Sequence, residues 1–251
     1  MIFLWIGLIA LGVVILYLWA IMPRMVKRPD RTPFEGKLYA HRGLFDNESD
    51  APENSLPAFA RAAEKGFGIE MDIQLTKDSV PVVFHDFTLK RACRTSGKVI
   101  DYTYDELKKM ELFCSQEHIP TFEEALKVID GRVPIIVELK IEWSDCRICR
   151  IADNILRKYN GAYAIESFNP LGLLWFRKNH KEVVRGQLAD HFRKEGTANA
   201  PFYFLLHYLT LNFLTRPDFI AYNHKYSKNM SRQICRYLYG AAAAGWTINS
   251  E

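Results

Sequence analysis

Two apolar stretches of the chain carry carboxylates at positions where side chains could converge. Glu70 and Asp72 lie two residues apart in "GIEMDIQ", and Glu138 lies two residues before Lys140 in "PIIVELK". If each stretch is a β-strand, alternate side chains point to the same side and these polar groups face one space. Carboxylates in an apolar interior are unfavourable unless they are paired or bind a cation. Three converging carboxylates would supply the hard oxygen ligands that suit Mg²⁺ or Ca²⁺ rather than zinc.

A buried ion-pair network is the alternative interpretation of the same carboxylates. Lys140, Arg42 and Arg185 could neutralise them without a metal ion. The spacing alone supports both interpretations equally.

Two further strand-like stretches bring histidines to the same setting. His41 follows "LYA" and precedes Arg42 and Gly43, and His85 closes the run "PVVFH". Two histidines at strand ends suit an acid–base pair. A surface turn at His41 and a structural His85 bonded to the backbone are the alternatives. Cationic groups, acid–base histidines and a hard metal together are what phosphoryl transfer requires.

Alternating strands and helices must position these residues. We expect strands at 38–43, 68–76, 81–86, 133–140, 163–168, 183–188, 218–223 and 243–249, and helices between them at 55–66, 121–130, 146–159 and 231–241. Such alternation predicts a parallel sheet covered by helices, in the form of a (β/α)8 barrel, with an open doubly wound sheet as the alternative. Barrel active sites lie at the C-terminal strand ends, where the candidate residues fall. No G-x-G-x-x-G or P-loop follows a strand, which disfavours nucleotide binding.

Size and charge narrow the class of protein. The chain has 251 residues, 49% of them hydrophobic, which suffices for one large core or two small domains. The formal net charge is +4, and much of the excess follows the first apolar run. No basic–aromatic pattern lies elsewhere, so we expect no nucleic-acid partner.

The N-terminus predicts a membrane anchor. Residues Ile2 to Met22 contain no charge and are long enough to cross a bilayer as a helix, and Trp5, Tyr17 and Trp19 lie toward its ends. A basic n-region and a small-residue cleavage site, which a signal peptide would carry, are not evident. The basic residues lie only on the C-terminal side, which favours a single-pass protein with a cytoplasmic main domain. These basic residues are Arg24, Lys27, Arg28 and Arg31.

Five scattered cysteines argue against a disulfide framework and fit a reducing compartment. Cys146 and Cys149 form a C-x-x-C inside a predicted helix, with no second Cys or His pair near them in the sequence. Two thiols at helical spacing are the preferred interpretation, and a redox or zinc site is the alternative.

An apolar segment at 201–217, "PFYFLLHYLTLNFLTRP", precedes the predicted strand at 218–223. Phe202, Leu205, Leu206, Leu209 and Phe213 would share one face of a helix. A barrel helix packed on the sheet is the simpler interpretation. Because the other faces of this helix are also apolar, the alternative is a segment that dips into the membrane surface and guides lysolipids to the site.

The motifs "AHRG", "PENSLPAF", "GIEMDIQLTKDSVPVVFHD", "IPTFEEAL", "VELK" and "GWTIN" resemble, in order and spacing, the glycerophosphodiester phosphodiesterase family. The resemblance runs from about Leu38 to Asn249. It implies a (β/α)8 TIM barrel with a small insertion at about residues 87–118. "LKRACRT" stands where the family usually shows L-x-R-T-T. The chain stops shortly after "GWTIN", where the family continues with a helix, an eighth strand and a closing helix. We therefore expect a barrel that lacks the last strand and helix.

The resemblance also implies roles for individual residues. They are the acid–base histidines His41 and His85, the metal carboxylates Glu70, Asp72 and Glu138, the phosphate-side groups Arg42 and Lys140, and Trp246 as an aromatic side chain near the substrate. The metal would be Mg²⁺ or Ca²⁺, and the role of Asn54 in "PENS" stays open.

Together these features predict a transmembrane anchor (1–22), a linker (23–37) and a phosphodiesterase barrel (38–251). The expected activity is metal-dependent hydrolysis of glycerophosphodiesters to glycerol phosphate and an alcohol. One alternative is lysophospholipase D action on lysophospholipids at the membrane. The other, of a different class, is a non-catalytic, membrane-tethered binding module or defective fragment.

Overall fold

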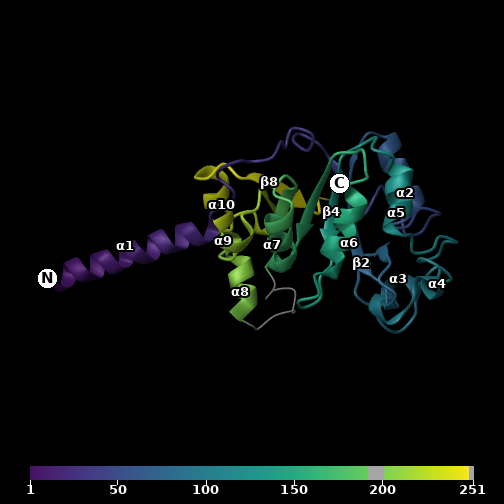
Figure 1. Ribbon diagram of the computed structural model, residues 1–251, viewed down its shortest axis with the longest axis horizontal. Coiled ribbons are helices and arrows are strands. Elements are labelled where there is room, and N and C mark those ends of the chain that lie inside the picture. Colours follow the sequence, from purple (N-terminus) through teal and green to yellow (C-terminus); the bar gives the residue numbers. More distant parts are fainter. Residues whose placement is uncertain (192–200, 249–251) are drawn as a thin grey trace.

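A single sheet curled into a barrel forms the centre of the molecule, as shown by a computed structural model that describes residues 1–191 and 201–248 (Figure 1). The predicted barrel is confirmed, with the last residues of the expected strand 243–249 and of the chain lying outside the described part. Within these residues the strands are β1 (Tyr39–His41), β2 (Gly68–Leu75), β3 (Pro81–Val83), β4 (Ile135–Leu139), β5 (Tyr163–Ser167), β6 (Val184–Ala189), β7 (Phe219–Asn223) and β8 (Ala242–Trp246).

The strands pair in chain order, which is the topology of a barrel. The hydrogen-bonded order is β1-β2-β4-β5-β6-β7-β8, and every neighbouring pair along this path is parallel. The order never reverses, so the doubly wound alternative is wrong. Among the described residues β8 does not pair with β1, so the barrel is nearly closed.

The predicted strand at 81–86 is wrong in length and direction. Only β3 forms there, and it pairs antiparallel to β2 as a short hairpin arm, with Ile73 opposite Val83. His85 therefore lies on the segment after β3 and not at the C-terminal end of a parallel barrel strand.

The helices cover the outside of the barrel. They are α2 (Leu56–Glu64), α5 (Phe122–Ile129), α6 (Arg147–Leu156), α7 (Pro170–Asn179), α8 (Pro201–His207), α9 (Asn212–Thr215) and α10 (Met230–Tyr237). Helix α7 was not predicted, although Asn169 caps it by accepting a hydrogen bond from the Leu171 amide at 3.0 Å. Outward side chains such as Ile69 and Val137 pack against these helices in the main core.

Alternation along the strands separates the two faces of the sheet. Asp72 lies opposite Glu138 in the β2–β4 register, and Glu138 lies opposite Glu166 in the β4–β5 register. Residues at the intervening positions, Met71 and Val137, belong to the core between sheet and helices. The carboxylates therefore share the interior side of the barrel.

The segment expected as an insertion, residues 87–118, carries short elements with a small core of its own. These are α3 (Lys90–Cys93), a 3₁₀ turn (Val99–Asp101) and α4 (Tyr104–Leu107). Leu89, Val99 and Leu107 are fully buried together with Val82 of β3. The hairpin arm β3 thus holds this small core against the barrel.

The segment 201–217 is not one continuous helix. The backbone turns at Leu209 with a φ of 56°, which separates α8 from α9. Leu206 and Leu209 are buried, whereas Phe202, Phe204 and Leu205 are exposed. The expected single apolar face is therefore wrong.

Helix α1 (Ile2–Ile21) projects away from the barrel (Figure 1). Its mean hydropathy is 2.6, and none of its most apolar 18-residue window is buried. It is long and apolar enough to cross a membrane, a property that signal sequences share. Residues 23–37 run along the barrel, where Arg24 donates to the Lys181 carbonyl at 2.6 Å and Arg31 to the Asp218 carbonyl at 3.1 Å.

Candidate active site

The three carboxylates predicted as metal ligands converge inside the barrel. Glu70 and Asp72 come from β2 and Glu138 from β4, and one carboxylate oxygen of each lies within 4.8 Å of the others. All three are at least 93% buried, with exposed fractions of 7%, 0% and 6%. In the part of the chain that the structure describes, this is the one cluster of acidic, His or Cys residues with metal-binding spacing.

Lys140 lies directly after β4 and joins two of these carboxylates. Its Nζ is 2.9 Å from Asp72 Oδ1 and 2.8 Å from Glu138 Oε1. Burial opposes the charges, yet Lys140 lowers the pKa of Asp72, and Asp72 together with Glu138 raises the pKa of Lys140. Asp72 and Lys140 therefore form a charged pair at neutral pH.

The other two carboxylates of the cluster, Glu70 and Glu138, have raised pKa values instead of lowered ones. Burial raises the pKa of Glu138 to about 7, and burial and the Asp72 charge raise the pKa of Glu70 well above its ordinary value. The site thus holds more buried carboxylates than Lys140 alone can keep ionised. An additional cation among these oxygens would relieve that repulsion, so the residues fit a divalent metal ion.

A fourth interior carboxylate, Glu166 of β5, was missed in the sequence. It is 5% exposed and lies opposite Glu138, and burial and the neighbouring Glu138 and Asp72 raise its pKa well above the ordinary value. The signal was present, because Glu166 occupies an inward position of "YAIES" just as Glu138 does in "IIVEL".

The turn after β1 brings His41 and Arg42 to the same cavity. Arg42 has a φ of 59° and Gly43 a φ of 84°, and a Cβ at Gly43 would lie only 2.9 Å from Ala58. Glycine is therefore required where the chain turns closely over α2. The turn aims the Arg42 backbone N–H at Glu70 Oε2, to which it donates at 3.1 Å.

His41 stands between the carboxylates and the open edge of the barrel. Its Nε2 is 3.9 Å from Glu70 Oε2, and its Nδ1 is 3.3 Å from the Thr247 hydroxyl, which follows β8. This contact joins β1 to the segment that follows β8, the two ends of the strand order among the described residues. Burial and the neighbouring Arg42 lower the pKa of His41 to about 4, so the ring is neutral at pH 7.

The "PENS" stretch supplies polar contacts that the sequence left unassigned. Asn54 Nδ2 donates to Asp72 Oδ2 at 2.9 Å, and Glu53 Oε1 accepts from Arg42 Nη1 at 3.0 Å. Arg42 Nε also lies 3.7 Å from Asp72 Oδ2. These contacts fix the Asp72 carboxylate and the Arg42 guanidinium relative to one another.

His85 is positioned by the segment after β3. Gln74 Nε2 donates to the carbonyls of Phe84 and Asp86, both at 2.8 Å, which holds this segment at the barrel rim. The His85 Nδ1 lies 2.6 Å from Asp86 Oδ1. The Nδ1 contact leaves the Nε2 atom as the nitrogen available for proton transfer.

Arg91 of α3 ties this rim together and was also missed. Its guanidinium bonds both Glu53 and Asp86, at distances between 2.6 and 3.0 Å. A chain of contacts therefore runs from Arg42 through Glu53, Arg91 and Asp86 to His85. The stretch "LKRACRT", which stands where the family usually shows L-x-R-T-T, contains this arginine, but the sequence alone does not indicate its partners.

The structure keeps two other sequence candidates away from the carboxylates. Arg185 lies on the outer face of β6, opposite Ile165, and donates to the carbonyls of Val183 at 3.1 Å and Lys181 at 3.4 Å. Its expected part in a carboxylate network is wrong. The C-x-x-C pair is in α6, where Cys149 belongs to the core between sheet and helices, and burial raises the pKa of both Cys149 and Cys146.

Trp246 ends β8 on its inner face. Its ring packs edge-on against Phe168, with centroids 6.0 Å apart, and its buried Nε1 has no hydrogen-bond partner. Trp246 is therefore at the same end of the barrel as the carboxylates, next to Thr247 and its contact with His41.

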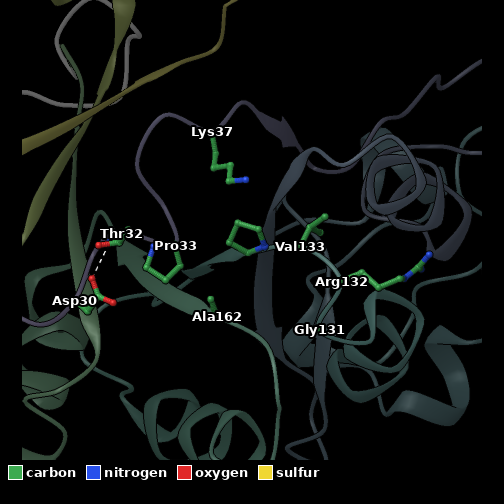
Figure 2. A pocket seen from close by; sticks show the side chains of 9 residues that line it. Asp30, Thr32, Pro33, Lys37, Gly131, Arg132, Val133 and Ala162 are labelled. Carbon is green, nitrogen blue, oxygen red and sulfur yellow. Dashed lines mark hydrogen bonds between the residues drawn. The ribbon is translucent and has the colours of Figure 1, made fainter.

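A groove of about 460 Å³ lies at the opposite end of the barrel and holds none of these residues. Figure 2 shows its lining, which includes Lys37 before β1, Val133 before β4 and Ala162 before β5. The candidate site residues Glu70, Asp72, Glu138, His41 and Arg42 thus lie at the other end, toward the C-terminal ends of the strands.

Comparison with known proteins gives one consistent match. A model of the glycerophosphoryl diester phosphodiesterase family matches residues 41–251. A glycerophosphodiester phosphodiesterase of Caldanaerobacter subterraneus is 34% identical over 187 residues, which cover 66% of this chain and 75% of the relative. Matches to the enzymes of Bacillus altitudinis (36% identity) and mouse (40%) cover 47% and 58% of this chain, and only about half of those relatives, 50% and 46%.

Solved structures show the same fold. An Oleispira antarctica phosphodiesterase, solved with its product sn-glycerol 3-phosphate, has a TM-score of 0.67 at 24% identity, over 85% of each chain. A glycerophosphodiester phosphodiesterase of Parabacteroides distasonis has a TM-score of 0.65 at 25% identity, over 85% of this chain and 84% of that one.

Proposed function

The chain belongs to the glycerophosphoryl diester phosphodiesterase family, and we propose that it hydrolyses glycerophosphodiesters to glycerol phosphate and an alcohol. The observation that carries the proposal is the convergence of Glu70, Asp72 and Glu138 beneath two histidines at the C-terminal end of the barrel. A non-catalytic module would have no need to keep this costly set of buried charges.

The carboxylates Glu70, Asp72 and Glu138 would hold a divalent cation. When bound, the ion supplies positive charge that neutralises the phosphodiester and stabilises the charge that develops on its oxygens. Oxygen ligands of this kind suit Mg²⁺ or Ca²⁺. Asn54 and Lys140 keep Asp72 oriented and ionised for this role.

Arg42 and Lys140 form the cationic wall of the site. Arg42 is fixed by Glu53, and Lys140 by Asp72 and Glu138, so both charges are in place before substrate arrives. Such preorganised cations stabilise a phosphoryl transition state without reorganising during the reaction. Trp246 offers an aromatic surface for the substrate on the β8 side.

The histidines divide the proton transfers. His41, neutral at pH 7, accepts the proton of the attacking hydroxyl, which by similarity to the family is the 2-hydroxyl of the glycerol. The phosphorus–oxygen bond to the alcohol breaks, and His85 donates a proton to the departing oxygen. Water then opens the cyclic phosphate, with the histidines in reversed roles. Asp86 fixes the His85 ring through Nδ1.

A second candidate is lysophospholipase D activity, in which the alcohol that leaves is the head group of a lysophospholipid. Helix α1 favours it, because an anchor of this length would hold the barrel at a bilayer. In the proposed arrangement, residues 1–22 span the membrane. The barrel, formed by residues 38–251, then lies in the cytoplasm. The basic residues that support this orientation are Arg24, Lys27, Arg28 and Arg31.

A substrate panel tests the proposal and separates the candidates. The full chain, in detergent or vesicles, is incubated with soluble glycerophosphodiesters and with lysophospholipids of the same head groups. Release of glycerol phosphate from soluble diesters supports the first candidate. Turnover confined to lysophospholipids supports the second. Absence of turnover on every diester, in protein that is folded and supplied with Mg²⁺ or Ca²⁺, contradicts both.

A further inference from the structure

The last turn of α1 is fastened to the barrel. Arg216, directly after α9, donates to the carbonyls of Trp19 at 3.2 Å and Met22 at 2.7 Å. Asn212 Nδ2 donates to the Ile21 carbonyl at 2.9 Å. The final carbonyls of a helix have no partner within the helix, and here the barrel supplies them. An arginine at this end also complements the helix dipole.

Side-chain packing supports the same junction. The Tyr17 hydroxyl lies 2.8 Å from the Ser231 hydroxyl of α10, and Trp19 packs on Phe213 of α9 with centroids 5.0 Å apart. Ile21 is fully buried in a cluster with residues of the barrel. Helix α1 is therefore part of the folded domain at this end and not a separate tether.

The length of α1 leaves no spacer between bilayer and barrel. At about 1.5 Å per residue its 20 residues measure roughly 30 Å, which is the thickness of the hydrocarbon core. The fastened residues Trp19 and Ile21 belong to that length. If α1 spans a bilayer, the membrane surface must lie against the elements that surround its last turn.

Those elements expose apolar side chains. On α8, Phe202 is 46% and Phe204 58% exposed; on α10 and just after it, Tyr237 is 73% and Leu238 62% exposed. Figure 1 shows α8, α9 and α10 grouped at the end of the domain from which α1 leaves. Asn229, which caps α10, donates to the His207 carbonyl of α8 at 3.1 Å, so the two helices are held together.

We propose that α8 and the C-terminal end of α10 rest in the headgroup region of the bilayer that α1 crosses. The occupant of this apolar face is the lipid surface, because α10 contacts the last turns of α1 through Ser231 and α8 is bonded to the cap of α10. The inference rests on the proposed membrane span. The membrane contact bears on the candidate active site, because α8 is joined to the barrel next to it. The Nδ1 atom of His207, in α8, lies 3.0 Å from the carbonyl oxygen of Asp190, the residue directly after β6. The membrane surface thus borders the β6–β7 side of the barrel mouth.

Depth-dependent quenching tests the face. In a Cys114→Ser background, which removes the exposed thiol, Phe204→Cys and Leu238→Cys each receive a fluorophore. Val13→Cys on α1 reports insertion, and Lys127→Cys on the exposed side of α5 is the matched control. The full chain is reconstituted in two sets of phosphatidylcholine vesicles, one with lipids that carry a nitroxide near the headgroup, which reports residues 204, 238 and 127, and one with a nitroxide deep in the acyl chain, which reports residue 13. An interfacial apolar side chain lies roughly 5–10 Å into this region. The fluorophores at positions 204 and 238 should therefore lose about half of their emission.

The outcomes separate the proposed membrane face of α8 and α10 from the proposed membrane span of α1. Quenching at 204 and 238 but not at 127 supports the membrane face. Quenching at 13 alone overturns the face and leaves the anchor intact. Protein that a high-salt wash removes from the vesicles overturns both, whatever its activity. A flexible insertion after Met22 is a second variant: it should leave quenching at 204 unchanged if the last turn is fastened, and abolish it if α1 is a loose tether.

Discussion

The Arg91 guanidinium donates two hydrogen bonds to the Glu53 carboxylate, at 2.6 and 3.0 Å, across 38 residues of sequence. The same guanidinium bonds Asp86, the partner of His85, and Glu53 in turn bonds Arg42. One arginine of the inserted segment thus links the groups around both proposed catalytic histidines.

Replacing Arg91 with Gln should lower kcat on the order of 10- to 100-fold, with a smaller change in KM, because Arg42 and His85 lose their fixed geometry. Arg94→Gln is the matched control, since the exposed Arg94 of the same segment donates to the Cys114 sulfur at 3.1 Å and, among the described residues, bonds neither Glu53 nor Asp86. Steady-state kinetics on a soluble diester measure the effect. Equal kinetics of the two variants would show that the Arg91 contacts do not position the site.

The same contacts predict a loss of stability in acid. Burial opposes their ionisation, yet hydrogen bonds from Arg91 to Glu53, and from His85 and Arg91 to Asp86, hold the pKa of both carboxyls below the ordinary value. The unfolded chain therefore binds protons more readily, and this contribution to stability is lost as pH falls below about 4, toward the folded pKa values. Urea midpoints measured between neutral and acidic pH should fall more steeply for wild type than for Arg91→Gln. Parallel curves would contradict this assignment.

The histidines should act on turnover and not on folding. His41→Ala and His85→Ala should each lower kcat by roughly 10²–10⁴-fold, the usual size of a general acid–base contribution. His180→Ala is the control, because His180 pairs with Asp153 at 3.0 Å in the helical layer. If either site variant keeps wild-type kcat, that histidine has no part in proton transfer.

Glu166 should affect the pH dependence of stability in the direction opposite to Glu53 and Asp86. Because burial and the nearby carboxylates raise its pKa, the native state holds a proton that the unfolded chain releases, and its contribution falls as pH rises above about 4.3. In chelator, Glu166→Gln should change the unfolding free energy by less than about 1 kcal/mol at acidic pH and flatten its decline at higher pH. A large loss of stability in Glu166→Gln at every pH would mean that its ionised form is needed for folding.

Asp72→Asn, which breaks the buried pair with Lys140, should lower the free energy of unfolding by about 3–5 kcal/mol.

The strand period accounts for most of what the sequence could show of the site. Because side chains alternate in β-strands, the spacings of Glu70 with Asp72 and of Glu138 with Lys140 were enough to place these groups in one cavity. The same rule would have found Glu166. The parallel order of the strands followed from their alternation with helices.

Long-range partners were beyond the sequence. The pairing of Arg91 with Glu53 depends on how the inserted segment folds back, which no local pattern encodes. His85 was placed on a parallel strand because an apolar run does not reveal its direction, and β3 is antiparallel. The turn at Leu209 was missed because a leucine with positive φ carries no sequence signal. The fastening of α1 depends on carbonyl contacts that side-chain patterns do not show.

The most direct test of the account is the rate at which sn-glycerol 3-phosphate is released from a soluble glycerophosphodiester as free Mg²⁺ or Ca²⁺ is varied, for wild type and Asp72→Asn. We expect a saturable cation dependence in wild type, loss of turnover in excess chelator with recovery when cation is restored, and little turnover in Asp72→Asn at any cation concentration. Undiminished release in excess chelator would contradict a metal site at Glu70, Asp72 and Glu138, and absence of release under every condition from folded protein would contradict the activity itself.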